Sequence, residues 1–430
     1  MGQPPSTRDE FEPSRWIRSG DTVVWGQAAA EPLGLTERLM AERHSVGTFS
    51  CFFGMNLSGT ARPEHSDCAT FLSYTAAGTN RALSIAGCLD VLPIHYSDYP
   101  RFFACGRLAA DVVLLQVSPA DATGRHSLGL ADEYLSAAID AARVVIAEVN
   151  DRVPHSSSRL LAPTEFDLMV QASRDPLTAT PSEPSVVERE IARNVAERIE
   201  DGSTLQTGIG ALPDAILTAL SGHSGLGLHT GSLGDRALGL IEAGVITNEH
   251  KSIDPGVAVA AVLIGSEHLY RFADCNPELQ LRPTQYTHDP ELLAAQRRFV
   301  AINTAFEVDL TGQINAEVAG GRYIGAVGGS MDFLRGAARS DGGLPIVALP
   351  STARGSSRIV ARLSGPVSTP RADAGLIVTE HGAVDLRGLT LSQRRRQMLE
   401  LVDPEHREAV ERECPAAAVP PAPAPIPTKE

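Results

Sequence analysis

Two stretches far apart in the chain share one pattern, "GDTVVWGQAAAEPLGLTERLMAERH" at 20–44 and "GSTLQTGIGALPDAILTALSGH" at 202–223. Each begins with a glycine and, two residues later, a threonine, followed by a short strand-like run. A glycine-containing turn, a proline and leucines at helical spacing come next. A strand, a glycine turn and a helix begun by proline make up the βα unit of α/β proteins. The repeat therefore predicts two similar α/β halves in tandem.

Apolar runs elsewhere agree with an α/β fold. The run 110–118 is almost continuously apolar, as in a strand covered on both faces. Other predicted strands lie at 144–149, 226–228, 257–264, 299–302, 344–349 and 375–378. Ser185 with Glu188 forms the capping box of a helix start.

Composition along the chain predicts the domain organisation. We expect one α/β domain at 17–175 and a second at 186–412, joined by a linker at 176–185 within a Pro- and Ser-rich stretch. We also expect a flexible N-terminus at 1–16 and a disordered Pro/Ala-rich tail at 413–430.

Charge and composition exclude several classes of partner. The 430 residues carry a net charge of −15, with 43% hydrophobic and 21% charged residues, as in globular proteins with no nucleic-acid or membrane partner. The N-terminus lacks the apolar region of a signal peptide, and no run approaches the ~18 apolar residues of a membrane span. The six cysteines show no CxxC spacing, so we expect reduced thiols, no metal site and a cytoplasmic protein.

Glycine-rich turns are the first candidate ligand-binding segments. In "GAVGGSMDFLRGA" at 325–337, Gly325, Gly328 and Gly329 precede a helix that starts near Ser330. Glycines let the backbone approach a ligand, and the N–H groups of this loop, that of Val327 included, can hold an anion or polarise a carbonyl. Gly208 and Gly210 occupy the turn of the second repeat.

Ionisable residues near these turns are the candidate catalytic groups. Glu317 precedes the glycine loop, and His381 follows a predicted strand in "VTEHGAVDLRG" at 378–388. A histidine with its unperturbed pKa near ~6.5 suits a general base. The corner "HTGSLGD" at 229–235 also follows a strand, where α/β proteins usually bind ligands, yet Gly231 stands at its centre.

Together these motifs resemble the acetyl-CoA hydrolase/transferase family, which includes acetate and 4-hydroxybutyrate CoA-transferases. The resemblance runs from Gly20 to about Ala409. It rests on the stretches "DVVLLQVSPADATGRHSLG", "LQTGIGALPDAIL", "IEAGVITNEHK", "INTAFEVDLTGQINAE", "GAVGGSMDFLRGAARSDGG" and "VTEHGAVDLRG". It implies two CoA-transferase-type α/β domains with the active site between them, and a homodimer. It also implies a coenzyme A thioester as substrate, with no permanently bound cofactor.

The resemblance also exposes a departure. Family members carry a catalytic glutamate in a pattern like H-S-E-x-x-x-D, which forms an acyl-glutamyl anhydride and then a glutamyl-CoA thioester. Here His229 and Asp235 are kept, but Gly231 stands in place of the glutamate. The family's G-G-Q is changed at Ser330, and its T-E-Y-G keeps Glu380 but has His381 at the tyrosine. Asn315, Glu317 and the loop glycines are kept, and we expect Asn315 and Glu380 to take part in binding the coenzyme A substrate.

Three functions follow from this departure. In the first, which we favour, a small acceptor (an amine, alcohol, carbanion or water) attacks the acyl-CoA directly, with His381 or His229 as base and the backbone N–H groups of 327–329 as oxyanion donors. In the second, a relocated nucleophile, Glu317 or less favourably Ser232, supports CoA transfer or hydrolysis. In the third, the protein binds an acyl-CoA without catalysis.

Overall fold

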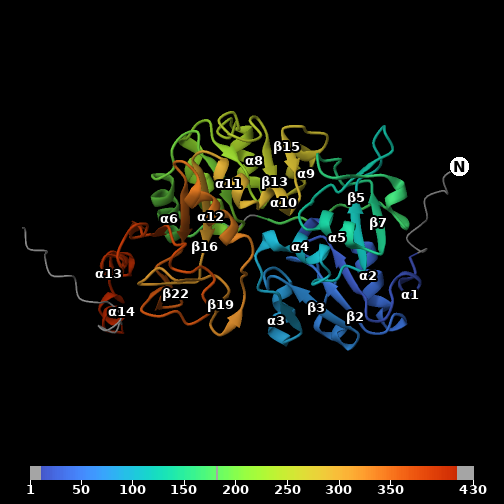
Figure 1. Ribbon diagram of the computed structural model, residues 1–430, viewed down its shortest axis with the longest axis horizontal. Coiled ribbons are helices and arrows are strands. Elements are labelled where there is room, and N and C mark those ends of the chain that lie inside the picture. The colour runs from blue at the N-terminus through green and yellow to red at the C-terminus, as the bar shows by residue number, and fades with distance from the viewer. Residues whose placement is uncertain (1–10, 181–182, 414–430) are drawn as a thin grey trace, which may run out of the picture.

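The structure is a computed structural model that describes residues 11–180 and 183–413. Its two halves lie side by side along the long axis of the molecule (Figure 1). The first half is built on a parallel sheet of seven strands in the order β4-β3-β2-β1-β5-β7-β9. These strands are β1 (Thr22–Trp25), β2 (Phe49–Phe52), β3 (Ala69–Ser73), β4 (Leu89–Val91), β5 (Val112–Val117), β7 (Val144–Asn150) and β9 (Leu168–Ala172).

The second half is built on a six-stranded sheet in the order β11-β10-β16-β21-β25-β26, parallel except for its last strand. The strands are β10 (Thr204–Thr207), β11 (Gly227–Leu228), β16 (Phe299–Thr304), β21 (Leu344–Ala348), β25 (Leu376–Thr379) and β26 (Gly382–Asp385). Two sheets of this kind with interleaved helices confirm the predicted α/β class.

Helices accompany both sheets. In the first half they are α1 (Pro13–Trp16), α2 (Leu33–Ala41), α3 (Asn80–Ala86), α4 (Tyr99–Ala104) and α5 (Leu135–Ala141). In the second half they are α6 (Val186–Ala196), α7 (Ala211–Ala219), α8 (Asp235–Glu242), α9 (Glu267–Ala273), α10 (Thr284–Thr287), α11 (Pro290–Ala295), α12 (Ser330–Arg339), α13 (Leu391–Met398) and α14 (Arg407–Glu413). None of the helices among the described residues is long and apolar enough to cross a membrane.

The repeated βα units are present as predicted. In the first half β1 leads to α2, and in the second β10 leads to α7. Every residue of β1, β5, β7 and β10 is buried, as expected for strands with both faces covered. One continuous core runs through both halves, since Val24 and Val113 belong to the same buried cluster as Leu205 and Val300.

Some local expectations differ from the structure. The single strand predicted at 257–264 is two short strands, β13 (Ala258–Ala260) and β14 (Val262–Leu263), because they pair with different partners, β15 (Leu279–Leu281) and β12 (Ser232–Leu233). Residues 11–16, expected to be flexible, include α1, and the side chain of Phe11 is fully buried. Residues 1–10, residues 181 and 182 of the predicted linker, and 414–430 of the predicted tail lie outside the described residues.

Candidate active site

The glycine loop at 325–329 joins the two halves. The backbone N–H of Ala76 and the hydroxyl of Thr75 both donate to the carbonyl of Gly325, at 3.4 and 3.1 Å. The N–H of Tyr96 donates to the carbonyl of Gly328 at 3.0 Å. The loop of the second half is therefore held by backbone and side chains of the first.

Two adjoining cavities open at this junction. The cavity lined by Gly231 and Glu133, here named the inner cavity, has a volume of about 250 Å³, and the cavity lined by the glycine loop, here named the outer cavity, has about 530 Å³. Both are lined by Thr75 from the first half and by Gly208, Ile209, Asn303, Gly329 and Ser330 from the second. The two cavities therefore share part of their walls.

The outer cavity has a glycine-rich wall, and its charged lining residues are Arg358 and Glu188. Its walls include the glycine loop, the turn from Gly208 to Pro213 and the side chain of Arg358. A side chain at Gly325 would place its Cβ 2.0 Å from the carbonyl oxygen of Ala316, so only glycine fits there. Helix α12 begins at Ser330, where unpaired N–H groups and the positive end of the helix dipole favour an anion. The end of the cavity at the start of α12 thus suits an anionic group of a ligand.

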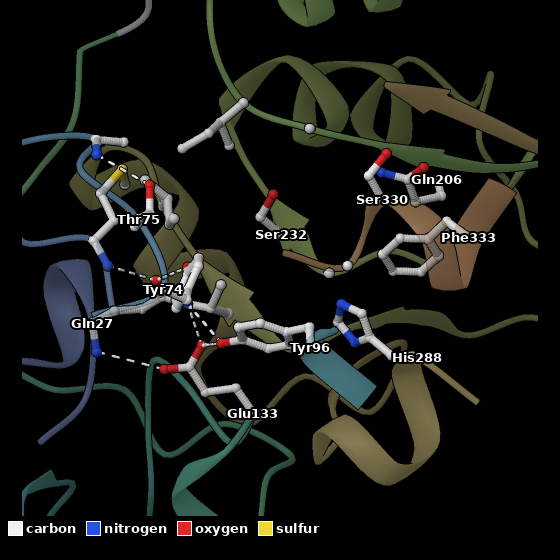
Figure 2. A pocket seen from close by; sticks show the side chains of 18 of the residues that line it. Gln27, Tyr74, Thr75, Tyr96, Glu133, Gln206, Ser232, His288, Ser330 and Phe333 are labelled. Atoms are coloured by element: carbon white, nitrogen blue, oxygen red, sulfur yellow. Dashed lines mark hydrogen bonds between the residues drawn. The ribbon is translucent and has the colours of Figure 1, made fainter. Parts of the chain in front are cut away.

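Gly231 lies on the inner cavity, next to Ser232. A Cβ at Gly231 would lie 3.2 Å from Nε2 of His288 and 3.6 Å from the ring of Phe333. A Cβ at Gly329 would lie only 2.5 Å from the same Nε2. The imidazole of His288 would therefore clash with a Cβ at Gly329 and would be in tight contact with one at Gly231. Figure 2 shows this ring between Tyr96 and Phe333.

His288 is a neutral imidazole at physiological pH. Its side chain is buried, with Nδ1 2.8 Å from the hydroxyl of Thr287, and burial lowers its pKa to about 3. The ring packs 4.8 Å from that of Tyr96 and 4.5 Å from that of Phe333, centroid to centroid. It can exchange a hydrogen bond with a ligand in the cavity, but it brings no charge there.

Glu133 brings a carboxylate to the inner cavity, on the other side of Tyr96 from His288 (Figure 2). Its carboxylate accepts hydrogen bonds from the hydroxyl of Tyr96 at 2.9 Å and from the side-chain amide of Gln27. Tyr74 completes this network by donating to Oε1 of Gln27 at 2.7 Å. Burial raises the pKa of Glu133 to about 7, although both hydrogen bonds favour the ionised form.

The backbone of Glu133 is also unusual. Its φ is +35°, in the left-handed region that a residue with a side chain rarely adopts. Such conformations persist where the surrounding structure imposes them, often beside a functional site.

Family comparisons agree with this architecture. The N-terminal domain of the acetyl-CoA hydrolase/transferase family matches residues 9–160, and its C-terminal domain matches residues 265–414. The chain belongs to this family. A 4-hydroxybutyrate coenzyme A transferase from Clostridium kluyveri is 35% identical over 92% of this chain and 94% of its own length.

Solved structures of the family have the same fold. RipA from Yersinia pestis has a TM-score of 0.88 at 32% identity, covering 94% of this chain and 96% of that one. A 4-hydroxybutyrate CoA-transferase from Porphyromonas gingivalis has a TM-score of 0.80 at 32% identity, covering 95% and 96%. The relatives that the chain matches are CoA-transferases and acetyl-CoA hydrolases. The expected homodimer and cytoplasmic location stay predictions.

The predicted glycines lie together around the cavities. Gly325, Val327, Gly328, Gly329 and Ser330 all line the outer cavity, as do Gly208 and Gly210 of the repeat turn. The structure brings these predicted residues to one cavity, and their role in ligand binding stays a prediction.

His229 and Asp235, the two kept residues of the corner, have structural contacts. His229 is fully buried, its Nε2 lies 3.2 Å from the carbonyl of Thr287, and burial with nearby Lys251 lowers its pKa to about 3. Asp235 accepts hydrogen bonds from the N–H and hydroxyl of Ser266, at 2.9 and 2.6 Å. Both lie outside the linings of the two cavities, so the position of His229 does not support a role as general base.

Glu317 and Asn315 position the glycine loop. The carboxylate of Glu317 accepts from the hydroxyls of Tyr323 at 3.0 Å and Ser368 at 2.7 Å, and its carbonyl accepts from the N–H of Gly325 at 2.9 Å. Oδ1 of Asn315 in turn accepts from the N–H of Glu317 at 3.1 Å. With its carboxylate committed and outside the cavity linings, Glu317 is not placed as a relocated nucleophile.

His381 lies in the turn between β25 and β26, outside the linings of both cavities. Its Nε2 is 3.7 Å from the carboxylate of Asp403 and 3.9 Å from that of Glu380. Glu380 accepts from the N–H and hydroxyl of Ser351, at 2.9 and 2.7 Å. The expectation that His381 acts as the base and that Glu380 binds the ligand has no support from their positions.

Sequence reasoning missed Glu133, His288, Tyr96 and Gln27. Glu133 precedes α5 in "GLADEYLSAAID", where an acidic residue is typical of the start of a helix. His288 lies in the polar stretch "PTQYTHDP". No local pattern marks either as a site residue, because they meet only through the packing of the two halves.

Proposed function

We propose that this protein is an acyl-CoA-dependent acyltransferase in which a second substrate attacks the thioester directly. One observation supports the proposal: Gly231, which the sequence resemblance aligns with the family's catalytic glutamate, lines the inner cavity, and His288 lies beside it. The carboxylates in the cavity linings are Glu133 and Glu188, and neither belongs to the Gly231 corner.

The outer cavity is the proposed site of the coenzyme A moiety. Its glycine-rich wall, Arg358 and the start of α12 suit a phosphate-bearing chain. Because Gly329 and Ser330 line both cavities, a thioester entering from the outer cavity brings its carbonyl to these residues. Backbone N–H groups at that point can stabilise the oxyanion that forms during transfer.

The inner cavity then holds the acyl group and the acceptor. The acceptor's nucleophilic atom adds to the carbonyl carbon, the C–S bond breaks, and the thiolate of coenzyme A leaves and takes up a proton. Holding both reactants in contact replaces a covalent enzyme intermediate, because positioning alone removes a large part of the barrier.

The test follows thiol release and intact protein mass in the same samples. Purified protein is incubated with acetyl-CoA, butyryl-CoA and 4-hydroxybutyryl-CoA, with and without small amines, alcohols and carboxylates. We expect thiol release without a change in protein mass. An acyl or CoA adduct on the protein would overturn direct transfer, and so would binding of acyl-CoA with no thiol release under any condition.

A variant sharpens this test. Gly231→Glu restores a carboxylate at the corner, where the backbone is outside the left-handed region and His288 must give by a few tenths of an ångström. We expect it to block direct transfer and to form a glutamyl-CoA adduct with acyl-CoA alone, releasing the acyl group as its carboxylic acid; added carboxylates should then discharge that adduct as a new acyl-CoA. Gly239→Glu is the matched control, since a Cβ there meets nothing within 4 Å.

A relocated nucleophile is the second candidate, and Glu133 rather than Glu317 is the residue that the structure favours for it. Glu133 is the carboxylate that reaches the inner cavity. A CoA or acyl adduct mapped to Glu133 would establish CoA transfer or hydrolysis through this residue.

A further inference from the structure

Within the described part of the chain, the inner cavity is lined by one acidic side chain, Glu133, and by no basic side chain that would pair with it. Among the described residues that line it, none is a lysine or an arginine, and its imidazole, His288, is neutral. The hydrogen bonds that Glu133 accepts come from neutral donors, the hydroxyl of Tyr96 and the amide of Gln27. The nearby charge of Asp132 opposes its ionisation further. A positive group is therefore what this carboxylate lacks.

Burial makes that lack costly. Glu133 is fully buried, and a carboxylate away from water is stable only when it is paired or well hydrogen-bonded. This is why burial raises the pKa of Glu133 to about 7. A cation within contact distance would restore the ionised form.

The rest of the inner cavity fits a small organic cation. Tyr74, Tyr96 and Phe333 line it, and the rings of Tyr74 and Tyr96 meet edge to face with centroids 5.1 Å apart. Aromatic faces attract ammonium groups through their quadrupoles. The volume of about 250 Å³ equals that of about eight water molecules, enough for a short acyl chain and a small acceptor.

A carboxylate acceptor fits poorly. It would bring a second negative charge into the cavity that Glu133 lines, and the two like charges would repel each other. A neutral acceptor would leave Glu133 with its neutral hydrogen-bond donors, Tyr96 and Gln27, and no cation. The charge of the cavity thus discriminates between acceptor classes.

We propose that the acyl acceptor is a small primary amine, whose ammonium group pairs with the Glu133 carboxylate inside the inner cavity. This proposal rests on direct transfer. The ammonium gives one proton to Glu133, and the freed nitrogen lone pair adds to the thioester carbonyl carbon. The C–S bond breaks, and the leaving thiolate takes a second proton from the nitrogen. The products are an amide and coenzyme A thiol, and Glu133 returns its proton to solvent.

The first experiment needs no variant. Wild-type protein receives butyryl-CoA and one of four acceptors of similar size at equal concentration: propylamine, ethanolamine, propanol or propionate. We expect the two amines to raise thiol release at least tenfold over buffer and to give the corresponding amides by mass spectrometry. Propanol and propionate should leave thiol release within twofold of buffer.

The second experiment tests Glu133 itself. Glu133→Gln should lower kcat/KM for the amine by on the order of 100-fold, the range of a lost general base, and leave the Kd for butyryl-CoA within twofold. In the wild type, kcat/KM should rise with pH through the range where Glu133 ionises, and the variant should lose that dependence. Glu278→Gln, an exposed glutamate of the second half, is the matched control.

The outcomes separate the two proposals. Thiol release that only propionate, propanol or water supports, with no protein adduct, overturns the amine proposal and leaves direct transfer standing. An unchanged kcat/KM for amines in Glu133→Gln also overturns the role of Glu133. A protein-bound acyl or CoA group overturns direct transfer itself. If Glu133→Gln does not fold, the acceptor series on the wild type still decides.

Discussion

Replacing Glu133 by glutamine should change how the stability of the protein depends on pH. The pKa of Glu133 is about 7 in the fold, against 4.5 for an ordinary glutamate, because burial opposes its charge. Between these two values the folded protein holds a proton that the unfolded chain releases. Folding stability from this group is therefore fully present below pH 4.5 and falls as the pH rises to about 7.

The size of the effect follows from the same two values. Each pKa unit corresponds to about 1.4 kcal/mol, so the ionisation of Glu133 removes about 3 kcal/mol of stability in total, most of it between pH 5 and pH 8. Glutamine cannot ionise and keeps an oxygen for the hydroxyl of Tyr96. Any hydrogen bond that the glutamine fails to make lowers the free energy of unfolding by the same amount at every pH. The test therefore compares how the stability changes with pH, not the stability at one pH.

The assay is thermal unfolding of wild type and Glu133→Gln from pH 5 to pH 8.5, with no acyl-CoA or amine present. About 3 kcal/mol corresponds to roughly 5–10 °C for a unit of 150–250 residues, so the wild-type midpoint should fall by that much relative to the variant across this range. Glu278→Gln should follow the wild type, because its side chain is exposed. Equal pH slopes for wild type and Glu133→Gln would refute the reasoning, since Glu133 would then ionise at its ordinary pKa.

Two further changes test the site's geometry. Gly329→Ala places a Cβ 2.5 Å from the ring of His288. The overpacking should lower the free energy of unfolding by about 1–3 kcal/mol in thermal unfolding, and it should reduce thiol release. The control is Gly222→Ala, where the Cβ meets nothing within 4 Å and the stability should change by no more than about 0.5 kcal/mol. Ser97→Ala removes the 2.7 Å hydrogen bond to the Asp332 carboxylate at the junction of the halves and should cost about 1.5–3 kcal/mol above pH 6. Ser97→Ala should also be cut faster by protease between the two halves. If neither proteolysis nor thermal unfolding changes, the hydrogen bond between Ser97 and Asp332 does not hold the halves together.

The backbone of the site was predictable because glycine placement is a local property. Gly325, Gly328 and Gly329 precede a helix in the sequence, and they line the outer cavity in the structure. The side-chain part was not predictable in the same way. His381 stands beside a kept family motif, yet β25 is separated from β16 by β21 in the sheet, and the histidine lies outside both cavities.

The sequence by itself determined the two tandem α/β halves, the position of the glycine loop and the absence of a glutamate at Gly231, because strand periodicity, turn residues and motif residues are all read along the chain. Only the tertiary structure decided which groups face that glycine. His288 reaches it from beyond α10, and Glu133 faces the same cavity from the other half of the molecule. Contacts between residues so far apart in the chain depend on how the two sheets pack, and burial at that junction is also what raises the pKa of Glu133.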